Sequence, residues 1–187
     1  MLKSNKHTIR VKGIKTNSNF VPKLKTCQIG NFRPSGIVFV TLKAESYKIP
    51  NMYPEELVKP MRADLANFGF EELHTADAVN AAIAKEGTTL VVVNSVCGCA
   101  AANARPAAKM SLENAKKPDN AVTVFAGVDK DAVNAARALM VPFPPSSPCM
   151  ALFKDGELVH MLERHHIEGR SADMIAENLT DAYNSYC

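Results

Sequence analysis

The stretch Thr88-Thr89-Leu90-Val91-Val92-Val93-Asn94 decides the fold. It is rich in β-branched residues and lacks the polar–apolar alternation of a half-exposed strand. It therefore predicts a strand that is buried on both faces, as in parallel or mixed sheets covered by helices. The segments on either side must then supply those helices and the neighbouring strands.

These flanking segments alternate between helix and strand. A second β-branched run predicts a buried strand over 121–126, and Asp155-Gly156 between two apolar runs predicts a hairpin. Pro106 lies within one predicted helix and is expected to kink it. Apolar residues recur at helical spacing, and capping residues or glycines mark where several of these segments start or end. These signals predict helices over 54–68, 75–85, 99–115, 131–140 and 171–183. The predicted class is α/β, with a small mixed central sheet covered by helices on both faces.

The chemistry is concentrated at Cys97-Gly98-Cys99, directly after the first buried strand and at the start of a helix. The positive end of the helix dipole and free backbone N–H groups lower the pKa of a thiol placed there. Cys97, at the junction, is the expected nucleophile, and Cys99, one step into the helix, is the expected resolving thiol. Thiols at this spacing are close enough for exchange.

Two other interpretations of this motif remain open, a pair of buried structural cysteines and half of a metal site. A zinc site would need two more ligands, and the sequence has no second CxxC or CxC. His165-His166 could supply them in principle, but we expect adjacent histidines in an extended segment to point in opposite directions. No metal or bound cofactor is predicted.

A second feature, Ser147-Pro148, directly precedes the run that leads from Cys149 into Lys154-Asp155-Gly156. This order resembles thioredoxins, in which the equivalent X–Pro bond is cis and lies against the active thiol. We therefore expect Pro148 to be cis and to belong to the substrate loop. The alternative is an ordinary trans proline in a proline-rich loop.

Together these features resemble the bacilliredoxin family over about 52–187. The stretches that carry the resemblance are 88–101, 105–108, 118–127, 145–148 and 164–169. The resemblance implies a thioredoxin-like fold and a cytosolic enzyme that removes bacillithiol from protein mixed disulfides. Its implied partners are bacillithiol, as thiol co-substrate, and bacillithiolated or disulfide-containing client proteins. A general disulfide isomerase or reductase is the alternative, followed by a metal or persulfide carrier.

Several residues near the motif have open roles. Cys149 departs from the serine expected in the family, and it is either a third thiol near Cys97 or a small core residue. Arg105 either contacts an anionic thiol ligand or is a solvated surface residue. Cys187 is either an extra thiol or a bystander, and Cys27 is expected to have no role.

Composition excludes other classes. Five cysteines are an odd number and too few for a disulfide scaffold at this length. No apolar run approaches the roughly 18–20 residues of a membrane span, and residues 1–20 lack the apolar core of a secretory signal. These observations predict a cytoplasmic protein with no membrane partner.

The charge is unevenly distributed. Residues 1–48 carry ten Lys or Arg against one acid, whereas 49–187 carry twelve against eighteen. The few aromatic residues of the basic segment do not alternate with its charges, so no nucleic-acid partner is predicted. We expect 1–51 to be an extension outside the domain and 52–187 to be the domain, because Met52 is followed by a clear helix opening with Pro54, Glu55 and Glu56.

The extension is therefore expected to be dispensable. A variant that starts at Met52 should match the full chain in melting temperature and in the rate of disulfide reduction. Differential scanning calorimetry and an insulin reduction assay measure these two quantities. A loss of several degrees in melting temperature would contradict the expectation.

Overall fold

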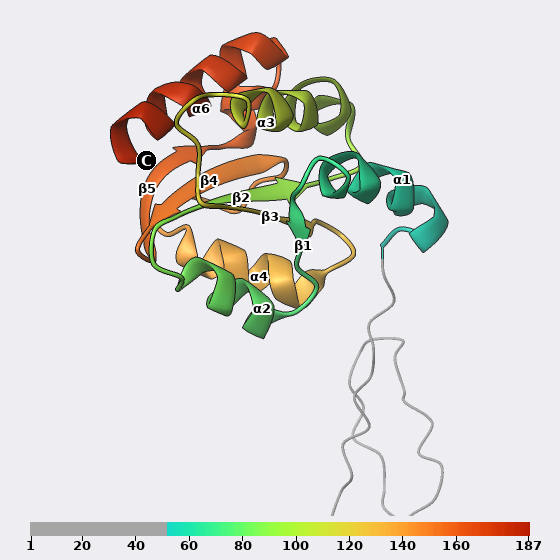
Figure 1. Cartoon of the computed structure of the whole chain (residues 1–187). Coiled ribbons are helices and arrows are strands. Elements are labelled where there is room, and N and C mark those ends of the chain that lie inside the picture. The colour runs from blue at the N-terminus through green and yellow to red at the C-terminus, as the bar shows by residue number, and fades with distance from the viewer. Residues whose placement is uncertain (1–51) are drawn as a thin grey trace, which may run out of the picture. The chain divides into compact units, whose positions relative to one another are not determined.

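The computed structural model describes residues 52–187 (Figure 1). Five strands form one mixed sheet in the order β1-β3-β2-β4-β5. The first three are parallel to one another, whereas β4 runs antiparallel to β2 and β5 antiparallel to β4. The strands are β1 (Glu71–Glu72), β2 (Thr88–Asn94), β3 (Asn120–Phe125), β4 (Cys149–Lys154) and β5 (Glu157–Leu162).

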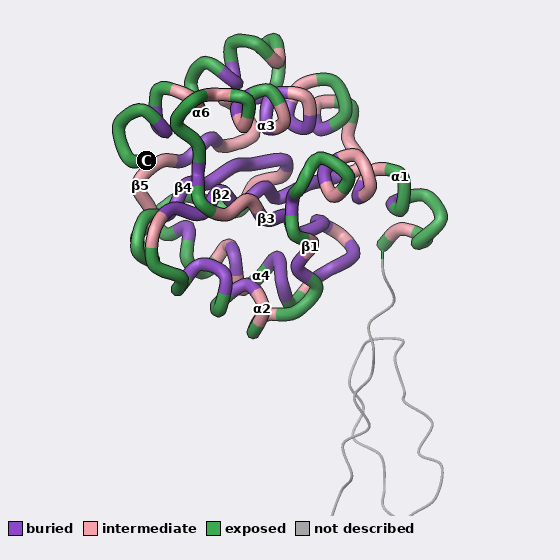
Figure 2. The backbone as a smooth tube through the Cα atoms, viewed as in Figure 1, coloured by how far each residue is buried: buried purple, intermediate pink, exposed green. Residues whose placement is uncertain are grey.

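The strand that the sequence singled out lies at the centre of this sheet. Every residue of β2 is buried, and β2 pairs with β3 on one side and β4 on the other. Figure 2 shows the burial running along these central strands. Side chains that point to opposite faces of β2, such as Leu90 and Val91, belong to two separate cores.

Helices cover both faces of the sheet. On one face lie α2 (Ala76–Ile83) and α4 (Lys130–Leu139), and on the other lie α3 (Arg105–Ser111) and α6 (Ala172–Tyr186), as Figure 1 shows. Two further helices, α1 (Glu55–Ala66) and the one-turn α5 (Arg164–Ile167), precede β1 and follow β5. The mixed sheet covered on both faces confirms the predicted class, and the fold is thioredoxin-like.

The helix predicted over 99–115 is not a regular α-helix throughout, and it ends at Ser111. A π-helical segment, η1 (Ala100–Ala104), precedes α3, and the Arg105 N–H donates to the Ala100 carbonyl. Pro106 has no N–H to offer the carbonyl four residues earlier, and its ring crowds that carbonyl. Before the proline, the helix therefore forms a backbone hydrogen bond that spans five residues instead of four, which makes its turns wider. The sequence alone predicts a simple kink there.

The predicted hairpin joins β4 to β5 through Asp155 and Gly156, which both have positive φ, 51° and 85°. Such a turn matches the twist of the flanking strands. The ladder is interrupted further along, because Leu152 pairs with His160 but Phe153 pairs with Leu158. One extra residue therefore forms a β-bulge in β5.

The start of the described chain is attached to the domain. The Met52 N–H donates to the Gly127 carbonyl at 2.9 Å, and Tyr53 packs against the small core around Phe125. The extension predicted over 1–51 lies outside the described residues. Among the helices described between 52 and 187, none has the length and apolar character needed to cross a membrane.

A buried ion pair that the sequence does not reveal connects α1 to the start of α4. The Arg62 guanidinium donates two hydrogen bonds to the Asp129 carboxylate, at 2.7 and 2.9 Å. Burial would raise the pKa of Asp129, but the hydrogen bonds from Arg62 and His74 outweigh it and lower that pKa. The same carboxylate accepts the Phe125 N–H at 3.1 Å, which fixes the end of β3.

Breaking this pair should destabilise the domain. Asp129→Asn removes the buried counter-charge of Arg62 and leaves only the longer ion pairs with Glu72 and Glu55, at 3.5 and 3.6 Å. We therefore expect a loss of about 3 kcal/mol in the free energy of unfolding. Urea denaturation measures it. The matched control is Lys85→Gln, which removes a surface partner of Glu71 at 3.9 Å and should cost less than about 1 kcal/mol.

The same pair predicts a pH dependence. Because the folded pKa of Asp129 lies below the unfolded value of 3.8, its stabilisation is present above that value and is lost as pH falls through the folded pKa. Asp129→Asn should therefore flatten the acid limb of a stability–pH curve. An acid limb equally steep in wild type and variant would contradict this role.

Candidate active site

The two motif thiols lie where β2 leaves the sheet and the next helix begins. Cys97 caps that helix, since its carbonyl accepts the N–H groups of Ala100 and Ala101 at 3.1 and 3.2 Å. Its sulfur accepts hydrogen bonds from the Ser95 hydroxyl at 3.2 Å and from the Ala100 N–H at 3.3 Å. Both Cys97 and Cys99 are free and partly exposed, so they are open to another sulfur.

The two thiols differ in acidity. Burial would raise the pKa of Cys97, but hydrogen bonds from Cys99, Ser95 and the Ala100 backbone outweigh it, so that pKa is lowered. The pKa of Cys99 is raised by burial, by its hydrogen bond to Cys97 and by the negative charge there. The pair thus favours a thiolate on Cys97 and a protonated Cys99.

A buried arginine holds the residues just before Cys97. The Arg105 guanidinium donates to the Asn94 side-chain oxygen at 3.2 Å, to the Ser95 carbonyl at 3.3 Å and to Asp64 of α1 at 2.9 Å. The expectation of a solvated surface residue was therefore wrong, because Arg105 is buried and its Nε and Nη1 groups donate to partners within the protein. Contact with an anionic thiol ligand stays a prediction. The role of Arg105 within the fold is to fix the turn that presents Cys97.

Pro148 lies beside this turn. Cys149 pairs with Val93 in the sheet, which brings the preceding Ser147-Pro148 level with the end of β2. The Ser147–Pro148 peptide bond is cis, as predicted, and Pro148 is buried. The sheet register thus brings the three predicted site residues, Cys97, Cys99 and Pro148, to the same end of the sheet.

Sequence reasoning missed Arg164, the first residue of α5. It donates to the Ser147 carbonyl at 3.1 Å and forms a fork with Glu168 at 3.1 and 3.3 Å. Its positive charge favours the thiolate forms of both Cys97 and Cys99 and so acts to lower the pKa of each. The sequence feature that could have identified Arg164 is its position, because it is a positively charged residue directly after the last predicted strand.

Cys149 is a core residue. It is 1% exposed and lies in the apolar cluster between the sheet and helices α2 and α4. Burial raises the pKa of its thiol to about 11, so it is protonated at neutral pH. The structure thus favours the small core residue over a third exchanging thiol.

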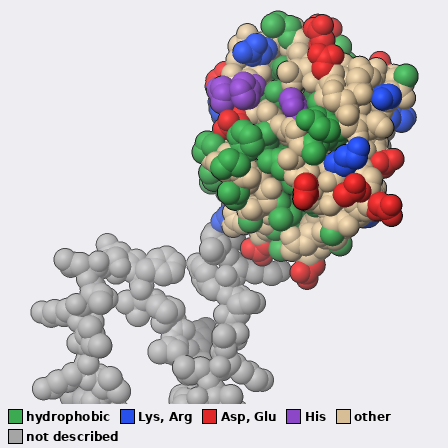
Figure 3. Space-filling view, turned by 90° about the vertical axis from the view of Figure 1, so that its left-hand side faces the viewer, with side chains coloured by type: hydrophobic (Ala, Val, Ile, Leu, Met, Phe, Trp, Pro, Cys, Tyr) green, Lys and Arg blue, Asp and Glu red, His purple; other side chains and the backbone are tan. Residues whose placement is uncertain are grey.

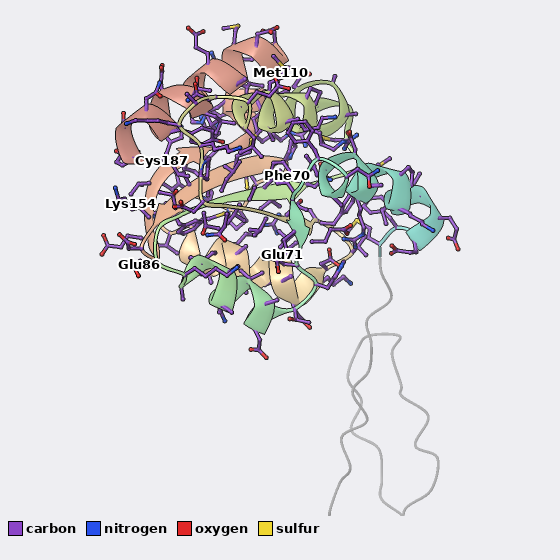
Figure 4. All side chains as sticks on the ribbon, in the orientation of Figure 1. Phe70, Glu71, Glu86, Met110, Lys154 and Cys187 are labelled. Carbon is purple, nitrogen blue, oxygen red and sulfur yellow. The ribbon has the colours of Figure 1, made fainter. Side chains whose placement is uncertain are left out.

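Cys187 lies at the far end of the sheet. Figure 4 shows it at the end of α6 on the same side as Lys154, whose ammonium donates to the Tyr186 carbonyl at 2.8 Å. Lys154 ends β4, five residues and roughly 17 Å from Cys149. Cys187 is therefore remote from the motif, and Cys27 lies outside the described residues.

The prediction that His165 and His166 point apart was wrong. They lie on the one-turn helix α5 with ring centroids 3.8 Å apart. Within the described residues 52–187, ligand atoms of Glu163, His165 and His166 all lie within 4.8 Å of one another, which is the spacing that a shared metal ion would need. Neither motif cysteine belongs to this group.

A thioredoxin-like fold with two free thiols at the end of its central strand defines a thiol–disulfide oxidoreductase. Comparison with known proteins agrees, since residues 53–187 match the family described as disulphide isomerase. A bacilliredoxin of Cytophaga hutchinsonii is 62% identical over 133 residues, which are 71% of this chain and 98% of that protein. A bacilliredoxin of Shouchella clausii is 54% identical over 136 residues, 72% and 94% of the two chains.

The chain belongs to the bacilliredoxin family. Among solved structures, a mutant thioredoxin from Halobacterium salinarum is similar with a TM-score of 0.45 and 19% identity, covering 64% of this chain and 91% of that one. The family assignment rests on the sequence relatives.

The acidity difference between the thiols can be tested directly. Alkylation of reduced protein at a series of pH values, followed by peptide mass spectrometry, titrates each cysteine separately. We expect the midpoint of Cys97 to lie below that of a free thiol and the midpoint of Cys99 to lie above it. Ser95→Ala removes a donor to the Cys97 sulfur and should move the Cys97 midpoint upward.

Ser185→Ala is the matched control, because that hydroxyl donates to the Asp181 carbonyl at the exposed end of α6. It should leave both midpoints in place. Equal midpoints for Cys97 and Cys99 in the wild-type protein would refute the assignment of the more acidic thiol.

Proposed function

We propose that this oxidoreductase removes bacillithiol from protein mixed disulfides, with Cys97 as nucleophile and Cys99 as resolving thiol. The observation that carries the proposal is the set of hydrogen bonds on the Cys97 sulfur, from Ser95, Ala100 and Cys99. A sulfur that accepts several donors is stabilised as the thiolate, which is the form that attacks disulfides.

The reaction consists of two exchanges. The Cys97 thiolate attacks the bacillithiol sulfur of the mixed disulfide, the old S–S bond breaks, and the client leaves as a thiolate that takes up a proton. Cys97 then carries bacillithiol. In one route Cys99, after losing its proton, attacks the Cys97 sulfur, so that bacillithiol leaves as a thiolate and a Cys97–Cys99 disulfide remains. In the other, the thiolate of a free bacillithiol attacks the bacillithiol sulfur of the adduct, so that Cys97 leaves as a thiolate and the symmetrical bacillithiol disulfide forms. Because the second route needs a pool of reduced thiol, we propose the cytoplasm as the compartment.

Arg164 and Pro148 support the first exchange. The Arg164 charge lies close enough to favour the Cys97 thiolate and holds the Ser147 carbonyl next to Pro148. Arg164 therefore contacts the loop that we expect to bind the client and also stabilises the negative charge on the attacking sulfur.

Apolar side chains precede this loop, with Val141 69% and Phe143 37% exposed. Figure 3 shows hydrophobic side chains gathered on one face of the molecule.

A general protein disulfide isomerase is the second candidate, favoured by the description of the matching family. It would use the same first attack, but on a disulfide between two protein thiols. The thiol released from the client separates the two activities.

The division of labour predicts different fates for two variants. With a bacillithiolated client, Cys99→Ser should accept bacillithiol on Cys97 and keep it until free bacillithiol is added, because the first exchange needs only one thiolate. Cys97→Ser should leave the client modified. Intact mass spectrometry of both proteins detects the adduct.

Three other outcomes would contradict the proposal. An adduct on Cys99 in Cys97→Ser, with none on Cys97 in Cys99→Ser, would reverse the roles. Rearrangement of scrambled protein disulfides without any bacillithiol adduct would favour the isomerase. Metal bound to the reduced wild type, with no adduct in either variant, would identify a carrier.

A further inference from the structure

A pocket of about 310 Å³ lies between β5, α5 and α6, and neither Cys97 nor Cys99 lines it. Leu162 of β5 and Met174 and Ile175 of α6 form its apolar wall. Its polar lining comes from His160, His166, Arg170 and Asn178.

The pocket lining lacks acidic residues although the domain is acidic. None of its lining residues is Asp or Glu, whereas 49–187 carries eighteen acids against twelve Lys and Arg. Arg170 forms no ion pair with any residue of the described part of the chain. An arginine without a counter-charge at an acid-free pocket favours an anionic ligand.

The neighbouring side chains present donors. The His166 Nδ1 accepts the Glu163 N–H at 3.2 Å, so the proton of the neutral ring is on Nε2. The His160 Nε2 donates to the Asn178 side-chain oxygen at 2.8 Å, which leaves the Asn178 amide group free to donate.

This arrangement disfavours a metal ion. To bind a metal through Nε2, His166 would have to lose the Nε2 proton and place one on Nδ1, which would break its hydrogen bond to the Glu163 N–H. The Glu163 carboxylate is itself engaged by the His166 backbone N–H in the capping box of α5.

The pocket lies at the thiol end of the sheet. Leu162 pairs with Met150, two residues after Pro148. Its strand, β5, is two strands from β2 and therefore roughly 10 Å from it. The Asn103 amide, one turn beyond Cys99, donates to the carbonyls of Ile167 at 3.2 Å and Arg170 at 2.6 Å. A ligand held in the pocket could thus extend a sulfur toward Cys97.

We propose that this pocket binds the carboxylate end of the small anionic thiol that releases Cys97, with Arg170 as the principal contact. The proposal rests on the proposed function and names the subsite of its co-substrate. The apolar wall would pack against the body of the thiol, while His166 and Asn178 would donate to its oxygens.

Kinetics of the releasing step test the proposal. The step is followed by mass spectrometry in Cys99→Ser charged with bacillithiol on Cys97, with bacillithiol or uncharged β-mercaptoethanol as the attacking thiol. Arg170→Gln should raise the KM for bacillithiol about tenfold, as expected for a lost charge-assisted hydrogen bond, and leave kcat unchanged. Its rate with β-mercaptoethanol should stay the same.

Lys59→Gln is the matched control, since it removes one positive charge from an exposed position on α1. It should leave both thiols unaffected. A second measurement titrates L-malate, a small dicarboxylate, into reduced wild-type protein. Saturable NMR shifts are expected at Arg170, His166 and Asn178, and they should be lost in Arg170→Gln.

The outcomes separate this proposal from the proposed function. An unchanged KM for bacillithiol in Arg170→Gln, or an equal loss with both thiols, overturns the subsite. If bacillithiol neither charges nor releases Cys97 in Cys99→Ser, the proposed function fails and the malate titration decides alone. Saturable shifts at the pocket then support an anion site, and their absence overturns it.

Discussion

The active end of this protein depends on the buried guanidinium of Arg105. It connects Asp64 of α1, the Asn94 side chain at the end of β2 and the Ser95 carbonyl, two residues before Cys97. A buried arginine with these partners allows the backbone little freedom at the turn. The Ser95 hydroxyl and the Cys97 sulfur are thereby held 3.2 Å apart before any substrate arrives.

The geometry gives two chemically identical side chains different properties. Cys97 caps the helix and accepts donors, whereas Cys99 provides one of those donors and experiences the charge on Cys97. Within the described part of the chain, the causes of the lowered pKa of Cys97 and the raised pKa of Cys99 include neither a general base nor a metal ion. The acidity of Cys97 comes from hydrogen bonds donated by the Cys99 thiol, the Ser95 hydroxyl and the Ala100 backbone, with Arg164 adding a positive charge from a different element.

The sequence predicted those features that are local. The run over 88–94 has the composition of a central strand, Asp155-Gly156 forms the expected turn, and the position of Cys97 follows from its place between strand and helix. The π-helical segment was not predicted, because Pro106 excludes a regular helix without specifying how the chain avoids it.

Long-range partners could not be predicted in the same way. Arg62 and Asp129 are 67 residues apart and Arg105 and Asp64 are 41 apart, so only the folded topology makes them neighbours. The histidines were misjudged for a related reason, since a single helical turn after β5 is too short to leave a periodic pattern.

The bulge in β5 has a consequence for the direction of His160. Leu158 packs toward α2 and α4, and Val159 packs toward α3 and α6, as alternation requires. The extra residue then places His160 on the same side as Val159, where it contacts Asn178 of α6. Deleting one residue at the bulge would leave a single position between Leu158 and Met161, which both face α2 and α4. That position would face α6, so it could hold either Val159 or His160 but not both. The irregular pairing thus determines which surface of the sheet carries an imidazole.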